Sequence, residues 1–333
     1  MRNFSVPSYF VNEALRNVEK YGISRDLLIK KHQIPVSLTS NPDARIPAAQ
    51  FARLQQDITI LLDDEMLGHL EKPLPTGCFA VACRSLINSK SVGIALSRYC
   101  QFYTLLDCGL SLEVIREKSL TRIRIAVTDK QYCYSLYAYE ATLYYVHRLM
   151  NWLGDSPIPL LRVNLDYSAP PHANDYRPLF FATPVFFDQP HTEIVLHTAL
   201  LKSPVAQNPR SLSRFLPVVI YELLTQDPGT TLWSNKISLL LQKNLASPIE
   251  MEEVAAKFAL HPQTLRRRLQ REGVHFQDIK NAVRRDFAID QLTRTRQSIE
   301  NIAAQTGFSE PSTFIRAFKS WTGMTPLGYR KTE

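Results

Sequence analysis

The sequence has no run of about 18 consecutive apolar residues, so we expect no membrane-spanning helix and no membrane partner. Residues 1–17 contain neither an apolar segment nor a small-residue cleavage site, and we expect no secretory signal. Cysteine is scarce, with five residues that all lie in the first half of the chain. Because this number is odd and no export signal is visible, we expect reduced thiols and a cytoplasmic location.

The motifs of common enzyme and metal sites are also missing. The chain has no G-x-S-x-G, no phosphate-binding P-loop and no H-E-x-x-H. Cys78 and Cys83 do not form a C-x-x-C pair, and His191 and His197 are an isolated pair on strand-like sequence. We therefore expect no catalytic residues, no metal site and no cofactor, and we predict that the protein is not an enzyme.

The charge that is present is unevenly distributed. Apolar residues make up 45% of the chain and charged residues 21%, a balance typical of a globular protein, and 333 residues suggest two domains. Residues 232–333 carry 16 Lys and Arg against 10 Asp and Glu, a net charge of +6, whereas the other residues contribute only +2. This asymmetry indicates a polyanion-binding domain joined to a nearly neutral one.

A stretch rich in Pro, Ser, Thr and Gly separates the two parts. Residues 203–230 contain SPVAQNPRSLS and TQDPGT around a short helical pattern, a composition typical of a connector. We therefore predict a first domain over residues 1–202, a linker over residues 203–230 and a second domain over residues 231–333.

The first domain mixes helix and strand patterns. Helical periodicity marks residues 6–31, 47–70 and 91–106, and a Tyr-rich helix is predicted within 132–153. The alternating segments LSLEVIREK and TRIRIAVTD predict an antiparallel hairpin, and LLRVNLDYS, PVFFD and TEIVLH suggest further strands. We expect an α+β domain.

The last third of the chain repeats itself. Val254-Ala255-Ala256 corresponds to Ile302-Ala303-Ala304 at an offset of 48, which is a fold-level signal. Beyond a turn, Leu265, Arg267 and Leu269 correspond to Phe314, Arg316 and Phe318 at an offset of 49. The second copy therefore has one additional residue in its turn.

Each copy has the pattern of a helix-turn-helix, at about 251–272 and 299–321, in an all-α domain. In the second copy we expect Ser309 to be the N-cap of the second helix, whereas His261 is the weaker cap of the first copy. Ala259 occupies the turn position of Gly307. If that position is left-handed, alanine costs about 1 kcal/mol there, which favours a less sharp first turn.

A further helical pattern, residues 276–295, lies between the copies. As a linker helix of roughly 25–30 Å it would hold the second helices of the two motifs about one DNA turn apart. Their outward faces carry side chains that suit bases and phosphates. These residues are Gln263, Arg266, Arg267, Gln270 and Arg271 in the first copy, and Ser312, Thr313, Arg316 and Lys319 in the second. A single basic face is more often plain solvated surface, but two equally placed faces in the basic domain favour DNA binding.

This region resembles the AraC/XylS family of bacterial transcription regulators. The similarity lies in VAAKF, PQTLRRRLQREG, VRRDFAIDQL and IENIAAQTGFSEPSTFIRAFKSWTGMTPLGYR. It implies paired helix-turn-helix motifs that bind promoter DNA. The family's base-reading positions correspond to Gln263, Arg266 and Arg267 in the first motif and to Ser312, Thr313 and Arg316 in the second. Ala259 and His261 depart from the usual glycine and serine.

The first domain resembles that of AraC-type regulators related to ornithine-utilisation and mycobacterial virulence regulators. The segments that carry this likeness are RIPAAQFARL, SVGIALSRYCQFYTLL and YRPLFFATPVFFDQPHTEIVLH. The resemblance implies a domain that binds a small effector and assists dimerisation. Because tyrosine joins an apolar ring to a polar tip, tyrosines and one arginine are candidate pocket residues. The candidates are Arg98, Tyr99, Tyr103, Tyr134, Tyr137 and Tyr144, and the simpler interpretation is that most of them pack in the core.

The sequence therefore predicts a bacterial, cytoplasmic, DNA-binding transcription regulator, an activator that responds to a small-molecule effector. Its expected partners are double-stranded promoter DNA, RNA polymerase and a second copy of the chain. An alternative keeps DNA binding but places control in protein abundance or in a protein partner, without a ligand. A DNA alkyl transferase, which the same DNA-binding module joins in some enzymes, is disfavoured because the cysteines lack the required spacing.

Overall fold

The structure is a computed structural model that describes residues 5–128, 132–181, 183–226, 232–247, 249–272 and 274–330. By their contacts, the residues form two compact units. The first unit comprises residues 1–12, 26–51 and 228–333, and the second comprises residues 13–25 and 52–227.

The second unit is built around a five-stranded sheet, as predicted for an α+β domain. Its strands are β3 (Leu110–Glu117), β4 (Leu120–Val127), β5 (Leu160–Asn164), β6 (Val185–Phe186) and β7 (Glu193–His197). The sheet order is β3-β4-β7-β5-β6, antiparallel except for the β5–β6 pair. The predicted hairpin is confirmed: β3 and β4 are antiparallel, and their last pair is Glu117 with Leu120. Lys118, between these two residues, has a φ of 46° and lies in the turn.

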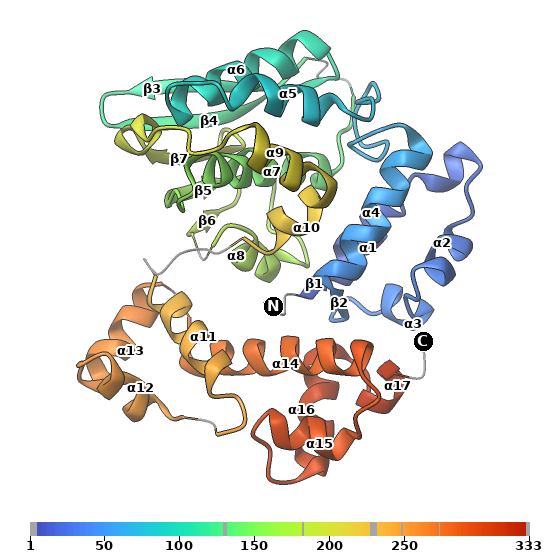
Figure 1. Ribbon diagram of the computed structural model, residues 1–333, viewed down its shortest axis with the longest axis vertical. Coiled ribbons are helices and arrows are strands. Elements are labelled where there is room, and N and C mark those ends of the chain that lie inside the picture. Colours follow the sequence, from blue (N-terminus) through green and yellow to red (C-terminus); the bar gives the residue numbers. More distant parts are fainter. Residues whose placement is uncertain are drawn as a thin grey trace. The chain divides into compact units, whose positions relative to one another are not determined.

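Helices pack against this sheet, with α6 on β3 and α7 on β4 (Figure 1). The apolar residues of α6 and α7 repeat at helical spacing, and both helices begin at a serine whose hydroxyl accepts a backbone N–H. The helical segments of the first two thirds of the chain are α1 (Ser8–Ala14), η1 (Val18–Tyr21), α2 (Arg25–Lys31), α3 (Val36–Thr39), α4 (Ala48–Leu62), α5 (Cys78–Leu86), α6 (Val92–Leu106), α7 (Leu136–Gly154), η2 (Ala173–Asp175), α8 (Tyr176–Leu179), η3 (Thr198–Lys202), α9 (Pro209–Phe215), η4 (Leu216–Val218) and α10 (Val219–Leu224).

The predicted helix over residues 47–70 is wrong in its last part, because α4 ends at Leu62. Asp63 has a φ of 48°, which stops the helix. The buried Asp64 carboxylate then accepts the backbone N–H groups of Met66, Gly68 and Leu74 at 2.7–2.9 Å. These bonds hold a compact turn whose apolar residues mimic helical spacing in the sequence.

Most of the residues predicted as a linker belong to the second unit and pack within it. Phe215 of α9 stacks on Trp152 of α7 with ring centroids 4.1 Å apart. Leu223 of α10 is fully buried, and its carbonyl accepts the hydroxyl of Tyr144 at 2.9 Å. Composition indicated a connector here, but the apolar residues between the Pro- and Ser-rich pieces anchor it.

The first unit contains the C-terminal helices. As predicted, all described secondary-structure elements of residues 232–330 are helices. They form α11 (Trp233–Lys243), α12 (Met251–Lys257), α13 (Pro262–Arg271), α14 (Phe276–Arg294), α15 (Ile299–Gln305), α16 (Pro311–Thr322) and α17 (Pro326–Arg330). No described helix has the length and the apolar character that crossing a membrane requires.

Part of the N-terminal chain completes the first unit. The antiparallel pair β1 (Ser5–Pro7) and β2 (Arg45–Pro47) lies against α14, where the Ser5 hydroxyl donates to Asp286 at 2.5 Å. Asn41 Nδ2 donates to the carbonyl of Thr322 at 2.9 Å, at the end of α16. The adjacent Gly323 has a φ of 72°, and a Cβ there would lie 1.8 Å from Asn41 Nδ2. The contact units thus divide the chain differently from the predicted domains, whose boundaries stay a prediction.

Candidate nucleic-acid interface

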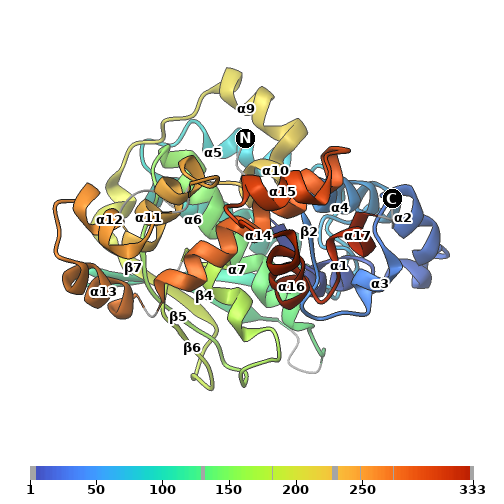
Figure 2. The same cartoon turned by 90° about the horizontal axis from the view of Figure 1, so that it is seen from below.

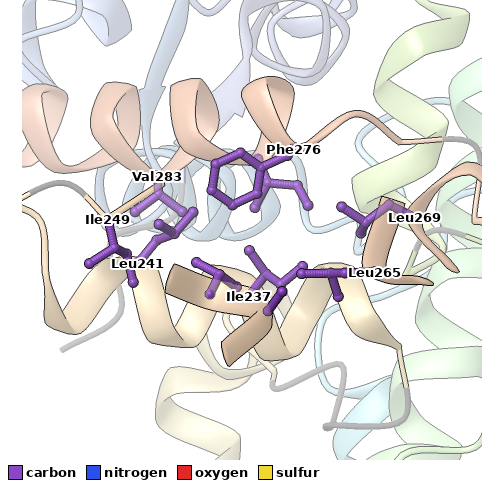
Figure 3. Close-up of a cluster of buried hydrophobic side chains, with 10 residues drawn as sticks. Ile237, Leu241, Ile249, Leu265, Leu269, Phe276 and Val283 are labelled. Carbon is purple, nitrogen blue, oxygen red and sulfur yellow. The ribbon is translucent and has the colours of Figure 1, made fainter. Parts of the chain in front are cut away.

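The first helix-turn-helix, α12 and α13, is fixed by a core that it shares with α11 and α14 (Figure 3). Leu265 and Leu269 of α13 are buried, and they point to the same cluster as Ile237 and Leu241 of α11. Phe276 and Val283 bring the first half of α14 into this cluster. Burying a leucine contributes about 1.5–3 kcal/mol, so the orientation of α13 is set by its apolar face.

The turns of the two motifs have the same backbone geometry. Ala259 has a φ of 52°, and Gly307 in the second motif has a φ of 73°. The next N–H closes each turn in the same way, with Leu260 donating to the Ala255 carbonyl and Phe308 to that of Ala303. The expected less sharp first turn is therefore wrong, because the fold holds alanine in a left-handed conformation that favours glycine.

Ala259→Gly is expected to raise the free energy of unfolding of the first motif by about 0.5–1 kcal/mol, because it removes this strain. Urea unfolding followed by the fluorescence of Trp233, which packs edge-on against Phe258, measures the change after Trp152 and Trp321 have been replaced by phenylalanine. Ala256→Gly is the matched control, since this exposed residue lies within α12. Glycine there should lower the free energy of unfolding by about 0.5–1 kcal/mol. If both variants changed the free energy of unfolding in the same direction, the left-handed conformation of Ala259 would not be a source of strain.

The second helix-turn-helix, α15 and α16, repeats this arrangement with aromatic residues. Phe314 and Phe318 take the places of Leu265 and Leu269, and all four are buried. Phe314 packs against Phe308 at 5.6 Å, and Phe318 packs edge-on against Tyr329 of α17 at 5.6 Å. The predicted correspondence of the two cores is confirmed.

The start of α16 differs from the prediction by one residue. Glu310, not Ser309, is the N-cap, and Pro311 is the first helical residue. His261 caps α13 as predicted, with Nδ1 accepting the Gln263 N–H at 3.2 Å. The left-handed residues Ala259 and Gly307 are 48 positions apart, whereas the N-caps His261 and Glu310 are 49 apart. Ser309 is therefore the additional residue of the second turn.

The outward faces of α13 and α16 are open to solvent where their side chains are described. Arg266, Arg267 and Arg316 are all exposed, and Arg316 Nη2 lies 3.4 Å from the Thr313 hydroxyl on the same face. The other exposed candidates are Gln263, Gln270, Ser312, Thr313 and Lys319. The side chain of Arg271 lies outside the described residues, although its backbone ends α13.

Helix α14 connects the motifs and contacts both (Figures 1 and 2). Its buried Lys280 lies 2.6 Å from the carboxylate of Glu250, the N-cap of α12. One turn later, Arg284 donates to the Gly307 carbonyl at 3.3 Å and lies over the Phe308 ring, 4.7 Å from its centroid. Burial lowers the pKa of Arg284. Part of the positive charge of this region thus stabilises the motifs themselves.

The length of α14 suits the predicted spacing. Its 19 residues, at about 1.5 Å each, extend over roughly 28 Å, which agrees with the length predicted for the linker helix. In the first half of this helix, Lys280 contacts the first motif and Arg284, one turn later, contacts the second. The structure therefore presents two polar helix faces, one on α13 and one on α16, and their spacing of one DNA turn stays a prediction.

A cavity of about 280 Å³ in the second unit is a candidate ligand site. Of the six predicted pocket residues, Tyr99 and Tyr103 of α6 line it, with ring centroids 4.5 Å apart. Burial raises the pKa of both phenols, so they stay neutral. The sequence interpretation missed Gln55, Glu65 and Tyr145, which also line the cavity.

The other predicted pocket residues lie elsewhere in the second unit. Tyr144 donates to the Leu223 carbonyl, and Arg98 donates to the Ser89 hydroxyl at 3.0 Å. Tyr137 is buried with its ring 4.5 Å from that of His69, and the buried Tyr134 lies 4.6 Å from Tyr132. These four residues do not line the cavity.

Comparisons with known proteins agree with this structure. Residues 22–205 match the family model described as the arabinose-binding domain of AraC transcription regulator, N-terminal, and residues 254–332 match a helix-turn-helix domain. The chain is similar to the ornithine utilization regulator of Pseudomonas aeruginosa, with 26% identity over 328 residues that cover 98% of this chain and 96% of that protein.

One further relative and one solved structure are also similar to this chain. The regulator VirS of Mycobacterium tuberculosis is 38% identical over 79 residues, covering 24% of this chain and 23% of VirS. The crystal structure of the transcriptional regulator CdpR from Pseudomonas aeruginosa has 24% identity and a TM-score of 0.31, covering 76% of this chain and 82% of that one. Since the two family models span both parts of the sequence, the chain belongs to the AraC family of transcription regulators, which bind DNA through helix-turn-helix motifs.

Proposed function

We propose that this regulator reads promoter DNA with α13 and α16 in two successive major grooves. The observation that carries the proposal is the exposure of equivalent polar faces on two helices whose opposite faces are equivalently buried. Gln263, Arg266 and Arg316 have the donors and acceptors for base edges, whereas Lys319 suits a phosphate. The net charge of +6 over residues 232–333 attracts the duplex and makes affinity dependent on salt.

The proposal includes a regulatory first domain. We infer that the cavity of the second unit binds a small effector and that the protein acts as an activator, as a homodimer, through contact with RNA polymerase. A ligand that binds one arrangement of the protein better than another shifts the population of the arrangement that binds DNA. The specific observation behind this part is the largely apolar cavity that Tyr99, Tyr103 and Tyr145 help to line. Control by abundance or by a protein partner is the alternative that a lack of any ligand effect would favour.

Arg316→Ala tests the base-reading role. Specific binding is expected to weaken by about 1–3 kcal/mol, while binding to random DNA and the melting temperature stay nearly unchanged. Fluorescence anisotropy with a selected operator and with a scrambled duplex measures both affinities. Arg210→Ala, an exposed arginine on α9, is the matched control and is expected to change neither affinity.

Lys319→Ala provides the contrast between phosphate and base contacts. This exposed residue lies on the same helix as Arg316, and its loss should weaken operator and scrambled DNA alike. The slope of log affinity against log salt concentration should become shallower by about one unit. If Arg316→Ala behaved in this uniform way too, α16 would hold the DNA backbone without reading bases.

A further inference from the structure

The cavity in the second unit is formed by parts of the chain that lie far apart in sequence. Its walls come from α4, from the turn after α4 together with the start of α5, from α6, from β3, from α7 and from the η4–α10 segment. All of these belong to one compact unit, so the cavity does not depend on the placement of the other unit. At about 280 Å³ it is near the lower limit of small-molecule pockets, which favours a compact ligand.

The wall of the cavity is mostly apolar, and several of its neutral polar groups are already paired. Gln55 Nε2 donates to the hydroxyl of Tyr145 at 2.5 Å, and the Thr142 hydroxyl donates to the Ala138 carbonyl at 2.7 Å. Among the described residues, the buried side-chain atoms that lack a hydrogen-bond partner belong to residues that do not line the cavity. A ligand is therefore recognised here mainly by apolar contact, because few donors or acceptors remain to be satisfied.

Glu65 is the exception to this apolar wall. Its two carboxylate oxygens accept the backbone N–H groups of Gly77 and Phe79, at 2.8 and 2.9 Å, and each oxygen keeps a further lone pair. No lysine, arginine or histidine lines the cavity in the described part of the chain, and the neighbouring Asp63 and Asp64 are also acidic. Burial first, and then these two aspartates, raise the pKa of Glu65 to about 7 although the two N–H groups oppose the shift.

We propose that this cavity binds a compact, largely apolar amine whose ammonium group pairs with the Glu65 carboxylate. The apolar walls bury the body of such a ligand, and its charge compensates a carboxylate that has no cationic side chain beside it. An apolar acid of the same shape would place a like charge against Glu65 and should bind more weakly for that reason. The inference names the ligand class of the proposed effector site and rests on the proposed regulatory function for its biological role.

The test uses the full-length protein and three probes of one shape: phenethylamine, phenethyl alcohol and hydrocinnamate. Isothermal titration calorimetry and thermal shift are expected to show saturable binding of the amine, weaker binding of the alcohol, and binding of the acid at least about tenfold weaker than that of the amine. Glu65→Gln should remove the preference for the amine while the alcohol still binds, which separates lost charge from lost fold. Equal or tighter binding of the acid would overturn the proposal.

A matched pair of variants locates the binding. Ala80→Trp fills the cavity and is expected to abolish amine binding, whereas Val81→Trp adds the same side chain to the exposed neighbouring position of α5 and is expected to leave it intact. Operator affinity of each variant without ligand is measured beside it. If the protein binds its operator but does not bind the amine, the proposed ligand class is wrong and the proposed function stands. If the protein binds the amine but does not bind operator DNA, the proposed regulatory function is wrong and the ligand class stands.

Discussion

Phe318→Ala lowers the free energy of unfolding of the second helix-turn-helix by about 3–5 kcal/mol, the expected cost of removing a fully buried aromatic side chain. Phe318 packs between Phe314 on its own helix, at 5.8 Å between ring centroids, and Tyr329 of α17, at 5.6 Å. Its removal opens a cavity between α16 and α17 that neither helix can close without losing its other contacts. Because α16 presents Arg316 and Lys319, operator binding is lost with the packing.

The three tryptophans make this effect measurable within the whole chain. Trp152 lies in the second unit, Trp233 beside the first motif and Trp321 in the second motif, 6.0 Å from Phe308. Unfolding by urea, followed by Trp321 after Trp152 and Trp233 have been replaced by phenylalanine, reports on the second motif. Lys319→Ala, one residue away and exposed, should change stability by no more than about 0.5 kcal/mol. A loss below about 1 kcal/mol for Phe318→Ala would mean that α16 is not held by this packing.

The recognition faces could be predicted because helical periodicity determines which side chains point inward. Once Leu265, Leu269, Phe314 and Phe318 are placed in the core, the residues between them have to face solvent. The duplication then predicts the second motif from the first. The error at the start of α16 was a single residue, since Ser309 is a good capping residue on composition alone and the backbone places Glu310 there.

The cavity could not be predicted in the same way, because its wall is assembled from segments spread over residues 55–223. Tyr144 was predicted from the sequence, but its neighbour Tyr145 lines the cavity. Successive side chains on a helix point about 100° apart, so an error of one residue selects a different face. Glu65 was missed because the turn that carries it resembles the continuation of α4 in the sequence. The bond from Asn41 to Thr322 likewise joins residues 281 positions apart without any local signal.

The second large effect is expected on acidification. His147 of α7 is fully buried: Nε2 donates to the Ile158 carbonyl at 2.9 Å, and its ring lies 5.6 Å from that of Phe181. Burial, and secondly the charge of Arg148, lower the pKa of His147 from 6.5 to about 3. The folded chain therefore keeps this imidazole neutral at a pH where the unfolded chain protonates it.

The sign of the pH dependence follows from this difference. Below pH 6.5 the unfolded state binds a proton that the folded state does not, so the stabilisation is complete above that pH and is lost as pH falls toward about 3. One pKa unit corresponds to about 1.4 kcal/mol, so His147 accounts for about 3 kcal/mol between pH 6.5 and about pH 4. Glu65, whose pKa is raised to about 7, acts in the opposite direction, because its stabilisation is lost as pH rises through about 7.

His147→Gln isolates the histidine, because glutamine can donate to the Ile158 carbonyl but does not titrate. The difference between the pH–stability profiles of the two proteins cancels the contribution of Glu65, which both contain. We expect the variant to be no more stable than the parent chain at pH 8 and to lose about 3 kcal/mol less between pH 6.5 and about pH 4. His197→Gln, at an exposed position, should leave the profile unchanged. Parallel profiles for His147→Gln and the parent chain would show that His147 is protonated in the fold, and that water or a movement of α7 reaches its ring.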